Sequence, residues 1–460
     1  MAGRQPTTDL TWLGSNRPMA RAIGRPMVRF LAIEASGGIL LMVATLVALV
    51  WANSPWSGSY YDFWHTEVHL AFGDVVSLDQ DGHSLTLVGF VNDVLMAVFF
   101  FVVGLEIKRE MVTGELRRPR AAMLPVAAAL GGMVVPALIF LAFNRSGAAS
   151  TGWGIPMATD IAFAVGVVSL LGRRVPTSLK VFLLSLAIVD DIGAILVIAV
   201  FYTSDVAMDW LFLGMATTVA VATLTRLKVW YTPFYILLGS VLWYAMFRSG
   251  VHTTIAGVAM GLLAPARPLL DRAVMPPIEF DQLDAEDLRE AKFRLNESVS
   301  VASRLEHRLH PVTGFVIIPV FALANAGVDI SWESLSNAMT SGITLGVAFG
   351  LVLGKVVGVS SFSFLALRLG LAVLPAGTTR RHLVGISAIA GIGFTVSLFV
   401  TGLAFDAVAL QDEAKVGILG ASIVAAVVGV MILLGARPVV AEGDGGGTAT
   451  VDATGQEPLV

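Results

Sequence analysis

The stretch that decides the fold is Val181–Thr203, VFLLSLAIVDDIGAILVIAVFYT, an apolar run with two adjacent carboxylates, Asp190 and Asp191, near its centre. A helix of this length can cross a bilayer. An Asp at the centre of a spanning helix costs roughly 2.5–3.5 kcal/mol on insertion scales, and here two stand side by side. A chain that retains such a penalty usually gains an ion or proton site from it, so this helix is the first candidate site.

The composition indicates a polytopic membrane protein. Of the 460 residues, 56% are hydrophobic and 14% are charged, whereas a soluble domain carries about 25% charged residues. The net charge of −4 and the lack of a long basic run give no indication of nucleic-acid binding. Cys is absent, which excludes disulfides, thiol catalysis and cysteine-bound metals. No soluble catalytic domain is visible, so we expect neither an enzyme nor a cofactor.

Apolar stretches predict an all-α protein with about twelve transmembrane helices. They lie near residues 30–51, 89–108, 121–142, 153–172, 178–202, 207–225, 231–248, 252–264, 312–328, 340–366, 383–405 and 414–436. Connections rich in Lys and Arg alternate with connections that have none, such as 53–87 and 329–339. The basic connections hold Lys108, Arg109, Arg117, Arg118 and Arg120, then Arg173 and Arg174, then Arg226 and Lys228, then Arg380 and Arg381. This positive-inside pattern places both termini in the cytoplasm.

Four segments lie outside the transmembrane helices. Residues 1–27 are polar and contain Arg, which predicts a retained cytoplasmic tail before a transmembrane domain at 28–437. Residues 74–87 alternate apolar and polar around Asp81-Gly82, which predicts a β-hairpin on the side opposite the basic connections. Residues 265–311 form a charged cytoplasmic loop, and residues 438–460 a Gly-rich, acidic, disordered tail.

Two of the predicted spans are interrupted in a similar way. The first, WGIPMATDIAFAVG from Trp153, contains Pro156 and the polar pair Thr159-Asp160. The second, LVGISAIAGIGFTVSLF from Leu383, contains Gly391 and Gly393. A break frees backbone groups that lipid cannot satisfy, and paired breaks in the two halves of a chain indicate a transporter's binding site. The alternative is two ordinary kinked helices.

The carboxylates are the candidate ligands. Asp190 and Asp191 point about 100° apart on one helix, so one can face a water-filled site while the other reaches a partner helix. We expect them to titrate as a coupled unit that holds either a proton or a hard cation such as Na⁺. Asp160 and the Thr159 hydroxyl are further oxygen ligands at the break. The alternatives are a structural ion pair or hydrogen-bonded cap for the first two, and compensation of half-helix dipoles or capping of a broken helix for Asp160.

Lys355 stands deep in span ten, roughly 15 Å from either end, and needs a buried anionic partner such as Asp160, Asp190 or Asp191. Gly346, Gly350 and Gly354 before it predict a close-packing helix face. Other charged or titratable groups stand near helix ends, where a pH-sensing role and simple solvation are both open. They are Glu106, Arg109 and Glu110 on one face of span two, Glu306, His307 and His310 before span nine, and His252 at the start of span eight.

Seven segments resemble the NhaA family of bacterial sodium/proton antiporters over roughly residues 30–436. They are NDVLMAVFFFVVGLEIKREM, ATDIAFAVGVVSLLG, LAIVDDIGAILVIAVFY, SGVHTTIAGV, LEHRLHPVTGFVIIPVFALANAGV, GKVVGV and GISAIAGIGFTVSLF. Their order and spacing are specific, whereas a lone Asp-Asp is not. This family is itself a recognised example of the paired broken-helix architecture.

The resemblance implies a fold and an activity. It implies twelve helices in an inverted repeat, with spans four and eleven broken and crossing at mid-membrane, in a homodimer of the bacterial inner membrane with a periplasmic β-hairpin contact near 74–87. It also implies electrogenic exchange of about two H⁺ for one Na⁺ or Li⁺ by alternating access, activated at alkaline pH.

The resemblance also implies roles for individual residues. Asp191 is the principal cation and proton carboxylate, Asp190 its neighbour paired with Lys355, and Thr159 and Asp160 lie at the helix crossing. Positions linked to pH response are Glu106, Arg109, Glu110, Glu306 and His252. The loop at 267–296 and the C-terminal tail are longer than the family pattern. The resemblance therefore implies pH regulation less directly than it implies transport.

Two other functions remain as alternatives. A Na⁺-coupled symporter of organic anions could use the same general fold with a wider cavity. An intramembrane aspartyl protease needs two facing Asp, which Asp160 and Asp191 could formally supply. The Gly-x-Gly-Asp motif of one such protease class is missing from the spans, and Lys355 would be unexplained.

Overall fold

The structure is a computed structural model, and it describes residues 36–69, 71–72, 76–77, 84–203, 206–229, 232–268, 289 and 298–436. Most described residues are helical. The predicted tails at 1–27 and 438–460 and most of the predicted loop at 265–311 lie outside the described residues.

Seven helical stretches in the described part are long and apolar enough to cross a membrane. Their elements are α4 (Leu87–Phe90), η3 (Val91–Leu95) and α5 (Met96–Val112); α6 (Pro119–Phe143); α8 (Thr177–Phe201); α9 (Met208–Arg226); α13 (Val301–Val312), η9 (Thr313–Ile317) and α14 (Ile318–Asn325); α16 (Gly342–Phe349), η10 (Gly350–Gly354) and α17 (Lys355–Arg368); and α20 (Val408–Leu434). The turns η3, η9 and η10 are π-helical.

Three pairs of helices pass the same test only when each pair is taken together, because each bends sharply at a short break. They are α2 (Ser36–Ala52) with α3 (Ser57–Trp64) at 115°, η5 (Ala148–Met157) with α7 (Ile161–Leu170) at 42°, and α18 (Arg380–Ile389) with α19 (Phe394–Ala404) at 46°. The described chain therefore holds seven to ten candidate spans by length and composition. The remaining described helices are η4 (Glu115–Arg117), η6 (Gly172–Arg174), α10 (Thr232–Ser249), α11 (Thr254–Leu263) and α15 (Trp332–Thr340).

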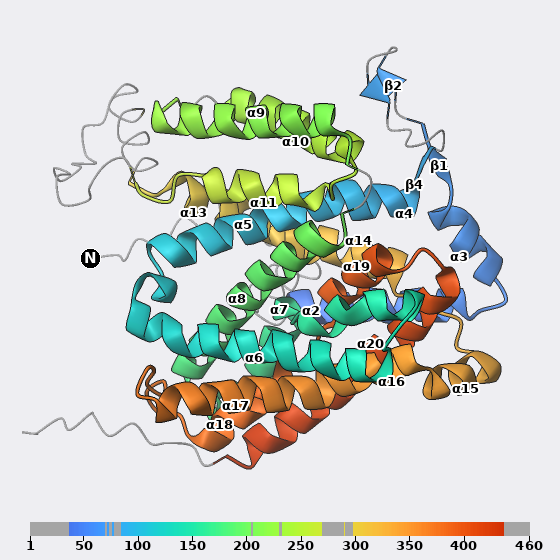
Figure 1. Cartoon of the computed structure of the whole chain (residues 1–460), viewed down its shortest axis with the longest axis vertical. Coiled ribbons are helices and arrows are strands. Elements are labelled where there is room, and N and C mark those ends of the chain that lie inside the picture. Colours follow the sequence, from blue (N-terminus) through green and yellow to red (C-terminus); the bar gives the residue numbers. More distant parts are fainter. Residues whose placement is uncertain are drawn as a thin grey trace, which may run out of the picture.

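The helices run roughly side by side (Figure 1). Helices α9, α10 and α11 lie at the top of the view, and α17, α18 and α20 at the bottom. Helix α8 runs obliquely between α5 and α6 and packs on both. This places the centre of α8, with its two carboxylates, inside the bundle.

Small residues allow the closest helix contacts. A Cβ added to Gly131 of α6 would lie 2.1 Å from the carbonyl oxygen of Gly358 in α17, so only Gly fits there. The predicted packing face before Lys355 is confirmed, because a Cβ on Gly354 would meet the Pro136 backbone at 2.8 Å and one on Gly350 would meet Pro156 at 2.8 Å. The helix that carries Lys355 is therefore held tightly against α6 and η5.

The strands differ from the predicted hairpin. Strand β1 (Glu67–Val68) pairs with β4 (Leu85–Thr86), and β2 (Ala71–Phe72) pairs with β3 (Val76–Ser77), both antiparallel. Both described strands after residue 74 therefore pair with strands before it, not with each other across Asp81-Gly82 as predicted. The predicted turn at 80–82 lies outside the described residues.

Two helix boundaries also differ from the prediction. The helix of span nine begins at Val301, not near 312, because Ser300 caps it by accepting a hydrogen bond from the Ser303 amide at 3.2 Å. The end of the predicted loop at 265–311 is therefore helical. Helix α11 begins at Thr254, so His252 lies in the connection before it, not inside the predicted span 252–264.

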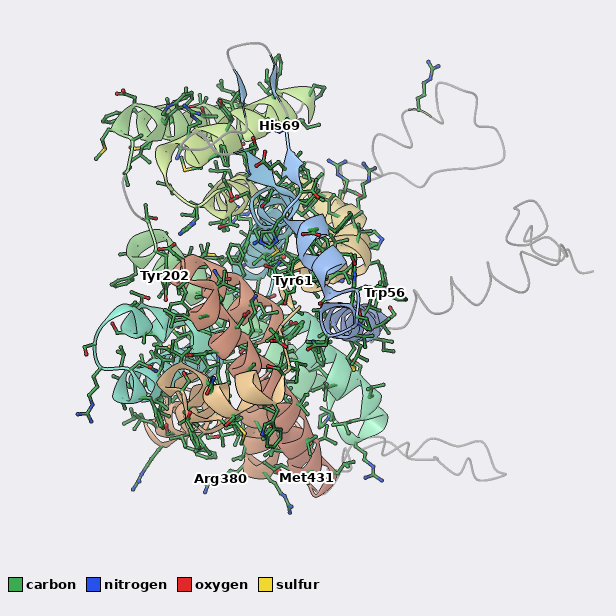
Figure 2. All side chains as sticks on the ribbon, turned by 90° about the vertical axis from the view of Figure 1, so that its right-hand side faces the viewer. Trp56, Tyr61, His69, Tyr202, Arg380 and Met431 are labelled. Carbon is green, nitrogen blue, oxygen red and sulfur yellow. The ribbon has the colours of Figure 1, made fainter. Side chains whose placement is uncertain are left out.

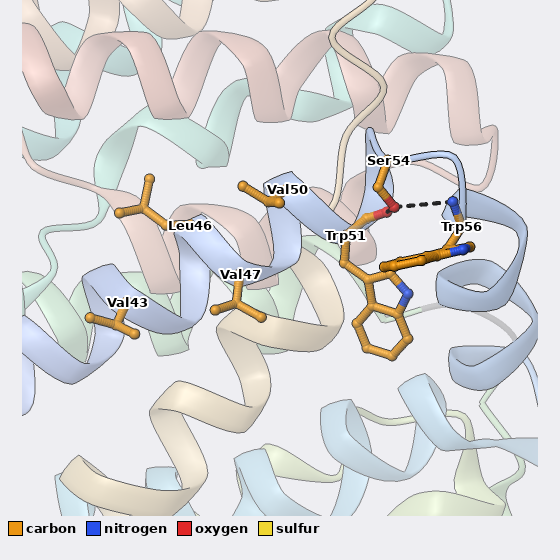
Figure 3. A pocket seen from close by; sticks show the side chains of 7 residues that line it. All are labelled: Val43, Leu46, Val47, Val50, Trp51, Ser54 and Trp56. Atoms are coloured by element: carbon orange, nitrogen blue, oxygen red, sulfur yellow. Dashed lines mark hydrogen bonds between the residues drawn. The ribbon is translucent and has the colours of Figure 1, made fainter.

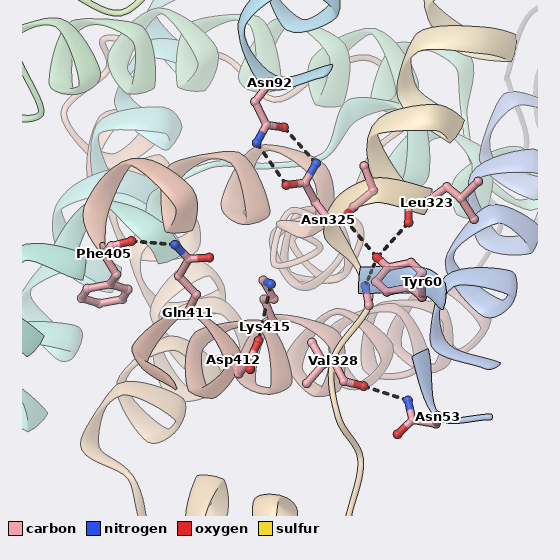
Figure 4. A network of polar contacts seen from close by, with 12 residues as sticks. Asn53, Tyr60, Asn92, Leu323, Asn325, Val328, Phe405, Gln411, Asp412 and Lys415 are labelled. Atoms are coloured by element: carbon pink, nitrogen blue, oxygen red, sulfur yellow. Dashed lines mark hydrogen bonds and ion pairs between the residues drawn. The ribbon is translucent and has the colours of Figure 1, made fainter. Parts of the chain in front are cut away.

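Polar contacts join α3 and η3 to α14 at the end of the bundle that carries the strands (Figure 4). The Tyr60 hydroxyl donates to the carbonyls of Leu323 and Ala324 at 2.9 and 3.0 Å. Asn92 and Asn325 exchange two side-chain hydrogen bonds of 3.3 and 2.9 Å. These contacts fix the end of α14 against η3.

A groove of about 450 Å³ lies along α2 (Figure 3). Its lining is almost wholly apolar and consists of Val43, Leu46, Val47, Val50, Trp51, Ser54 and Trp56. It contains no charged side chain, so it has no group that could bind an ion.

Candidate functional site

The candidate site is built around the middle of α8. Asp190 and Asp191 are 1% and 3% exposed, so both carboxylates are buried. Asp190 is the partnered one: its Oδ2 accepts from the Lys355 ammonium at 2.6 Å and from the Thr159 hydroxyl at 2.7 Å. One helix face thus directs a carboxylate at a buried cation.

Lys355 reaches Asp190 from the first turn of α17, directly after the π-helical turn η10. Its ammonium also donates to the Met157 carbonyl and, at 3.1 Å, to the Thr159 hydroxyl. The side chain is 1% exposed. Three acceptors satisfy the three N–H groups of the buried ammonium, which is what burial of a charge requires.

Asp191 has a different environment from its neighbour. It makes no hydrogen bond or ion pair with any described residue, and its buried Oδ1 has no partner. The Oδ1 of Asp190 is also buried and unpartnered. A buried carboxylate oxygen without a hydrogen-bond donor is costly, and binding of a proton or a cation would remove that cost.

Asp160 is the most fully bonded carboxylate of the three. It caps α7, with Oδ1 accepting from the Phe163 amide at 2.9 Å. Its Oδ2 accepts from both the amide and the hydroxyl of Thr395, at 2.9 and 2.7 Å, in the first turn of α19. One carboxylate therefore faces the N-termini of two helices, where the helix dipoles favour negative charge.

The bent pairs η5–α7 and α18–α19 meet at their breaks. The Asp160 amide donates to the Ile392 carbonyl at 2.7 Å, and the Thr159 hydroxyl donates to the Ala390 carbonyl at 2.9 Å. The Ser397 hydroxyl donates to the Ile155 carbonyl at 2.7 Å. The backbone groups freed by each break are thus satisfied by the other pair, next to Asp190 and Lys355.

The residues predicted at helix ends separate into different groups. Arg109 forms an ion pair with Glu306, and His310 lies 3.6 Å from Glu106, so α5 and α13 are joined by charges. Glu110 points elsewhere: it accepts from the Ser185 hydroxyl at 3.3 Å and from the Glu115 amide at 2.8 Å. The single face expected for Glu106, Arg109 and Glu110 therefore contacts two different parts of the bundle.

His252 lies far along the chain from these groups, in the connection between α10 and α11. Its Nε2 is 2.7 Å from the Tyr202 carbonyl, which can only accept, so Nε2 carries the proton. Burial lowers the pKa of His252, and the hydrogen bond to Tyr202 opposes this shift. The imidazole is thus held mainly in its neutral form.

Sequence reasoning missed two parts of the site and one further acid within a span. The Met157 carbonyl is a backbone group without a sequence signal, and Thr395 lies in the second interrupted span but was not among the candidate ligands. Asp93 is a third kind of omission: it is an acid inside span two, and its carboxylate accepts from the Thr253 hydroxyl at 3.0 Å. The insertion penalty used for Asp190 and Asp191 could have identified it.

The donors around the middle of α8 suit a hard cation. No group of three or more His, Cys, Asp or Glu side chains converges among the described residues. Two adjacent carboxylates with unpartnered oxygens, beside one hydroxyl, supply oxygen ligands only.

Comparisons with known proteins agree on one family. A family model described as Na+/H+ antiporter 1 matches residues 28–433. The chain is 48% identical over 415 residues to Na(+)/H(+) antiporter NhaA 3 of Frankia alni, which covers 89% of this chain and 88% of that protein. It is also 48% identical to the protein named Na(+)/H(+) antiporter NhaA of Oleidesulfovibrio alaskensis, over 89% of this chain and 93% of that protein. The identity is again 48% to the protein of the same name from Rhodopirellula baltica, over 90% of this chain and 94% of that protein.

Proposed function

Because the chain belongs to the NhaA family of Na⁺/H⁺ antiporters, we propose that it exports Na⁺ in exchange for H⁺ at Asp190 and Asp191. The observation that carries this assignment is Asp191, a buried carboxylate without a partner among the described residues. A proton or Na⁺ would each neutralise it, and the two would exclude one another. Exchange of one for the other is antiport.

The neighbouring residues have supporting roles in this proposal. Thr159 presents its hydroxyl oxygen to the same site, and Lys355 pairs with Asp190 through their 2.6 Å contact. Asp160 holds the two breaks together by bonding to the N-termini of α7 and α19. A rigid-body movement of these bent pairs around Asp191 would then open the site to one side of the membrane and afterwards to the other, as alternating access requires.

We further propose electrogenic exchange, with about two H⁺ entering for each Na⁺ or Li⁺. Two adjacent carboxylates provide two proton sites, and only one has a fixed cation partner. Both sites belong to this chain's own side chains, so no cofactor is needed. Regulation by pH would involve Glu106, Arg109, Glu110, Glu306 and His252, supported by the ion pair that joins α5 to α13.

The proposed topology has twelve spans in an inverted repeat, with η5–α7 and α18–α19 crossing at mid-membrane. The order of the described helices follows the predicted apolar stretches, which supports this count. The alternation of basic connections supports cytoplasmic termini in a bacterial inner membrane. A homodimer joined partly through the strands near 67–86 is the expected assembly, because exposed strand edges pair readily with a second copy. A monomer at every protein concentration would contradict that assembly.

The alternatives make different demands. The family consists of transporters and not enzymes, so the aspartyl-protease interpretation is wrong; moreover, Asp160 is already occupied by three donors. A symporter of organic anions would move Na⁺ without exporting the protons held inside a vesicle.

Everted membrane vesicles, acidified inside and containing a pH-sensitive dye, test the proposal. Adding Na⁺ or Li⁺ should release the dye's quenching, whereas K⁺ or choline should not. If Na⁺ and H⁺ compete for the same carboxylates, the apparent Na⁺ affinity should rise about tenfold per pH unit per competing proton below the site pKa. No Na⁺-induced proton movement would exclude antiport, and an affinity independent of pH would exclude a shared site.

A further inference from the structure

Tyr202 holds the first half of a bent helix pair in place. It directly follows α8, the helix of Asp190 and Asp191. Its hydroxyl accepts a hydrogen bond from the Gly154 amide at 3.1 Å and donates one to the Thr151 carbonyl at 2.7 Å. Both groups belong to η5, so one hydroxyl attaches η5 to the end of α8.

The same residue has a second anchor through its backbone. His252, before α11, donates to the Tyr202 carbonyl at 2.7 Å. Thr151 in turn donates its hydroxyl proton to the Ala404 carbonyl at 2.8 Å, at the end of α19. Tyr202 therefore lies where α8, both bent pairs and the α10–α11 connection come together, between α9–α11 and the rest of the bundle (Figure 2).

The packing around this contact leaves little freedom. A Cβ added to Gly154 would lie 2.7 Å from the Tyr202 hydroxyl oxygen, which requires that oxygen to move. Trp153 directly precedes Gly154 and Phe201 directly precedes Tyr202, and their rings make an edge contact with centroids 5.1 Å apart. The glycine allows the hydroxyl to reach the backbone of η5.

A short segment connects this contact to the ion site. Three residues after Gly154, the Met157 carbonyl accepts from Lys355, and Thr159 then bonds to both Lys355 and Asp190. Pro156, between them, has a fixed φ and packs against Gly350. A shift of η5 at Gly154 would therefore reach the oxygens around Lys355 and Asp190.

We propose that Tyr202 is a positioning residue for cation exchange. By docking η5 on α8, its hydroxyl sets the position of Met157 and Thr159 relative to the two aspartates. It binds no ion itself. The proposal rests on the antiport function proposed above, because its consequence is a change in apparent Na⁺ affinity.

The expected effect follows from a population shift. Tyr202→Phe keeps the ring but removes the hydroxyl, so the Gly154 amide and the Thr151 carbonyl each lose one partner. Loss of each ordinary hydrogen bond changes an equilibrium by roughly two- to tenfold. If the substitution shifts the equilibrium by that factor toward a state in which η5 is not docked on α8, the apparent Na⁺ affinity should fall by up to about tenfold. The maximal rate should change less.

Tyr235→Phe is the matched control. The Tyr235 hydroxyl is also half-buried and also donates to a backbone carbonyl at 2.7 Å, that of Val229, but it lies at the α9–α10 connection. It should leave the apparent Na⁺ affinity unchanged. Gly154→Ala perturbs the same contact from the other side, and it should also weaken Na⁺ affinity several-fold.

The double variant distinguishes positioning from general damage. In the Tyr202→Phe background the hydroxyl oxygen is gone, and the nearest remaining ring carbons would lie 3.2 and 3.4 Å from the methyl group that Gly154→Ala introduces. The two substitutions should therefore be non-additive, with the double variant no weaker than the weaker single variant. Additive losses, or equal behaviour of Tyr202→Phe and Tyr235→Phe, would overturn the proposal.

Hydrogen exchange gives a readout that does not depend on transport. Tyr202→Phe should accelerate amide exchange across residues 148–157, and Tyr235→Phe should not. Unchanged exchange in this segment would overturn the proposal even if the antiport assay succeeds. If wild-type protein shows no Na⁺-driven proton movement while this segment still loosens, antiport fails and the docking of η5 by Tyr202 stands.

Discussion

Asp160 at the meeting of the bent pairs and Asp191 in the middle of α8 are equally well buried, at 1% and 3% exposure, but their surroundings are opposite. Asp160 receives three hydrogen bonds from the N-termini of two helices. Asp191 receives none from the described residues. Both acids carry the same insertion penalty, so burial alone does not identify an ion site. The difference is whether the protein has already satisfied the charge.

Asp190 lies between these extremes. One of its oxygens is bonded to Lys355 and Thr159, and the other is buried without a partner. The comparison therefore orders the three acids from structural to reactive as Asp160, Asp190 and Asp191. Substitution of each acid, or of its partner, tests this order because stability and exchange should respond in opposite ways.

The largest effect on exchange is expected from Asp191→Asn. The substitution removes the charge that holds Na⁺ or H⁺, so exchange in vesicles should fall to background. The folded protein should be at least as stable as wild type, because a buried charge without a partner is lost. Dye dequenching and thermal unfolding in detergent measure the two quantities.

Asp209→Asn is the control for that variant, since Asp209 is an exposed acid in the first turn of α9. It should transport like wild type. Full exchange by well-inserted Asp191→Asn protein would show that the unpartnered carboxylate is not the ion site.

Lys355→Gln should have the next largest effect, and mainly on stability. Removing one partner of a buried ion pair costs about 3–5 kcal/mol because the other charge stays buried alone. Combining it with Asp190→Asn removes that charge, so the double variant should recover part of the loss in unfolding temperature. A double variant less stable than Lys355→Gln would mean that the pair is not the source of the cost.

The same variant tests how many protons move. If Lys355 itself carries a proton, active Lys355→Gln protein should exchange one H⁺ per Na⁺ and become insensitive to membrane potential. If both protons are carried by the aspartates, exchange should remain electrogenic. Measuring Na⁺ uptake with and without an imposed potential separates the two roles.

Asp160→Asn should lower stability more than it lowers exchange. The Asn amide presents one acceptor and one donor where the carboxylate offered two acceptors, so either Phe163 or Thr395 loses a partner. Leaving one buried donor unsatisfied costs about 1–3 kcal/mol. Exchange should persist at a reduced rate, in contrast to Asp191→Asn. If Asp160→Asn protein unfolds at the same temperature as wild type but shows no exchange, then Asp160, and not Asp191, is the ion-binding carboxylate.

The sequence could predict which charged residues lie buried within the spans, but not how their surroundings differ. Asp160, Asp190, Asp191 and Lys355 stand out because a charge in an apolar span is costly wherever it lies. Their partners come from far along the chain: Thr395 is 235 residues from Asp160, and the Met157 carbonyl is a backbone group. Neither partner can be found from local periodicity.

Helices were easier to predict than their ends or the strands. Apolar runs identify spans, but the charged first turns of α13 extend the helix beyond its apolar part to Val301. The Asp81-Gly82 signal suggested a turn, yet the described strands are only two residues long and pair with residues before 74. Two-residue strands have too little alternation to set a register from sequence.

The smallest expected effect concerns His252, which donates to the carbonyl of Tyr202, the residue directly after α8. It tests whether this outer contact is independent of the acids. Burial lowers the pKa of His252 in the folded protein. Between that lowered pKa and the ordinary value of about 6.5, the unfolded chain binds the proton more readily, so protonation reduces stability as pH falls through this window. Above about pH 6.5 the imidazole is neutral in both the folded and the unfolded chain, so it no longer makes stability depend on pH.

His252→Gln keeps an N–H donor for the Tyr202 carbonyl but cannot titrate. Relative to wild type, its unfolding temperature should therefore rise as pH falls below about 6.5 and show no growing difference at alkaline pH. His65→Gln is the matched control, because His65 also contacts a backbone carbonyl, that of Tyr61 at 2.8 Å, but is exposed. A difference that appears only at alkaline pH would contradict the neutral, donating imidazole. Exchange by His252→Gln that equals wild type at alkaline pH would separate this contact from ion binding at Asp191.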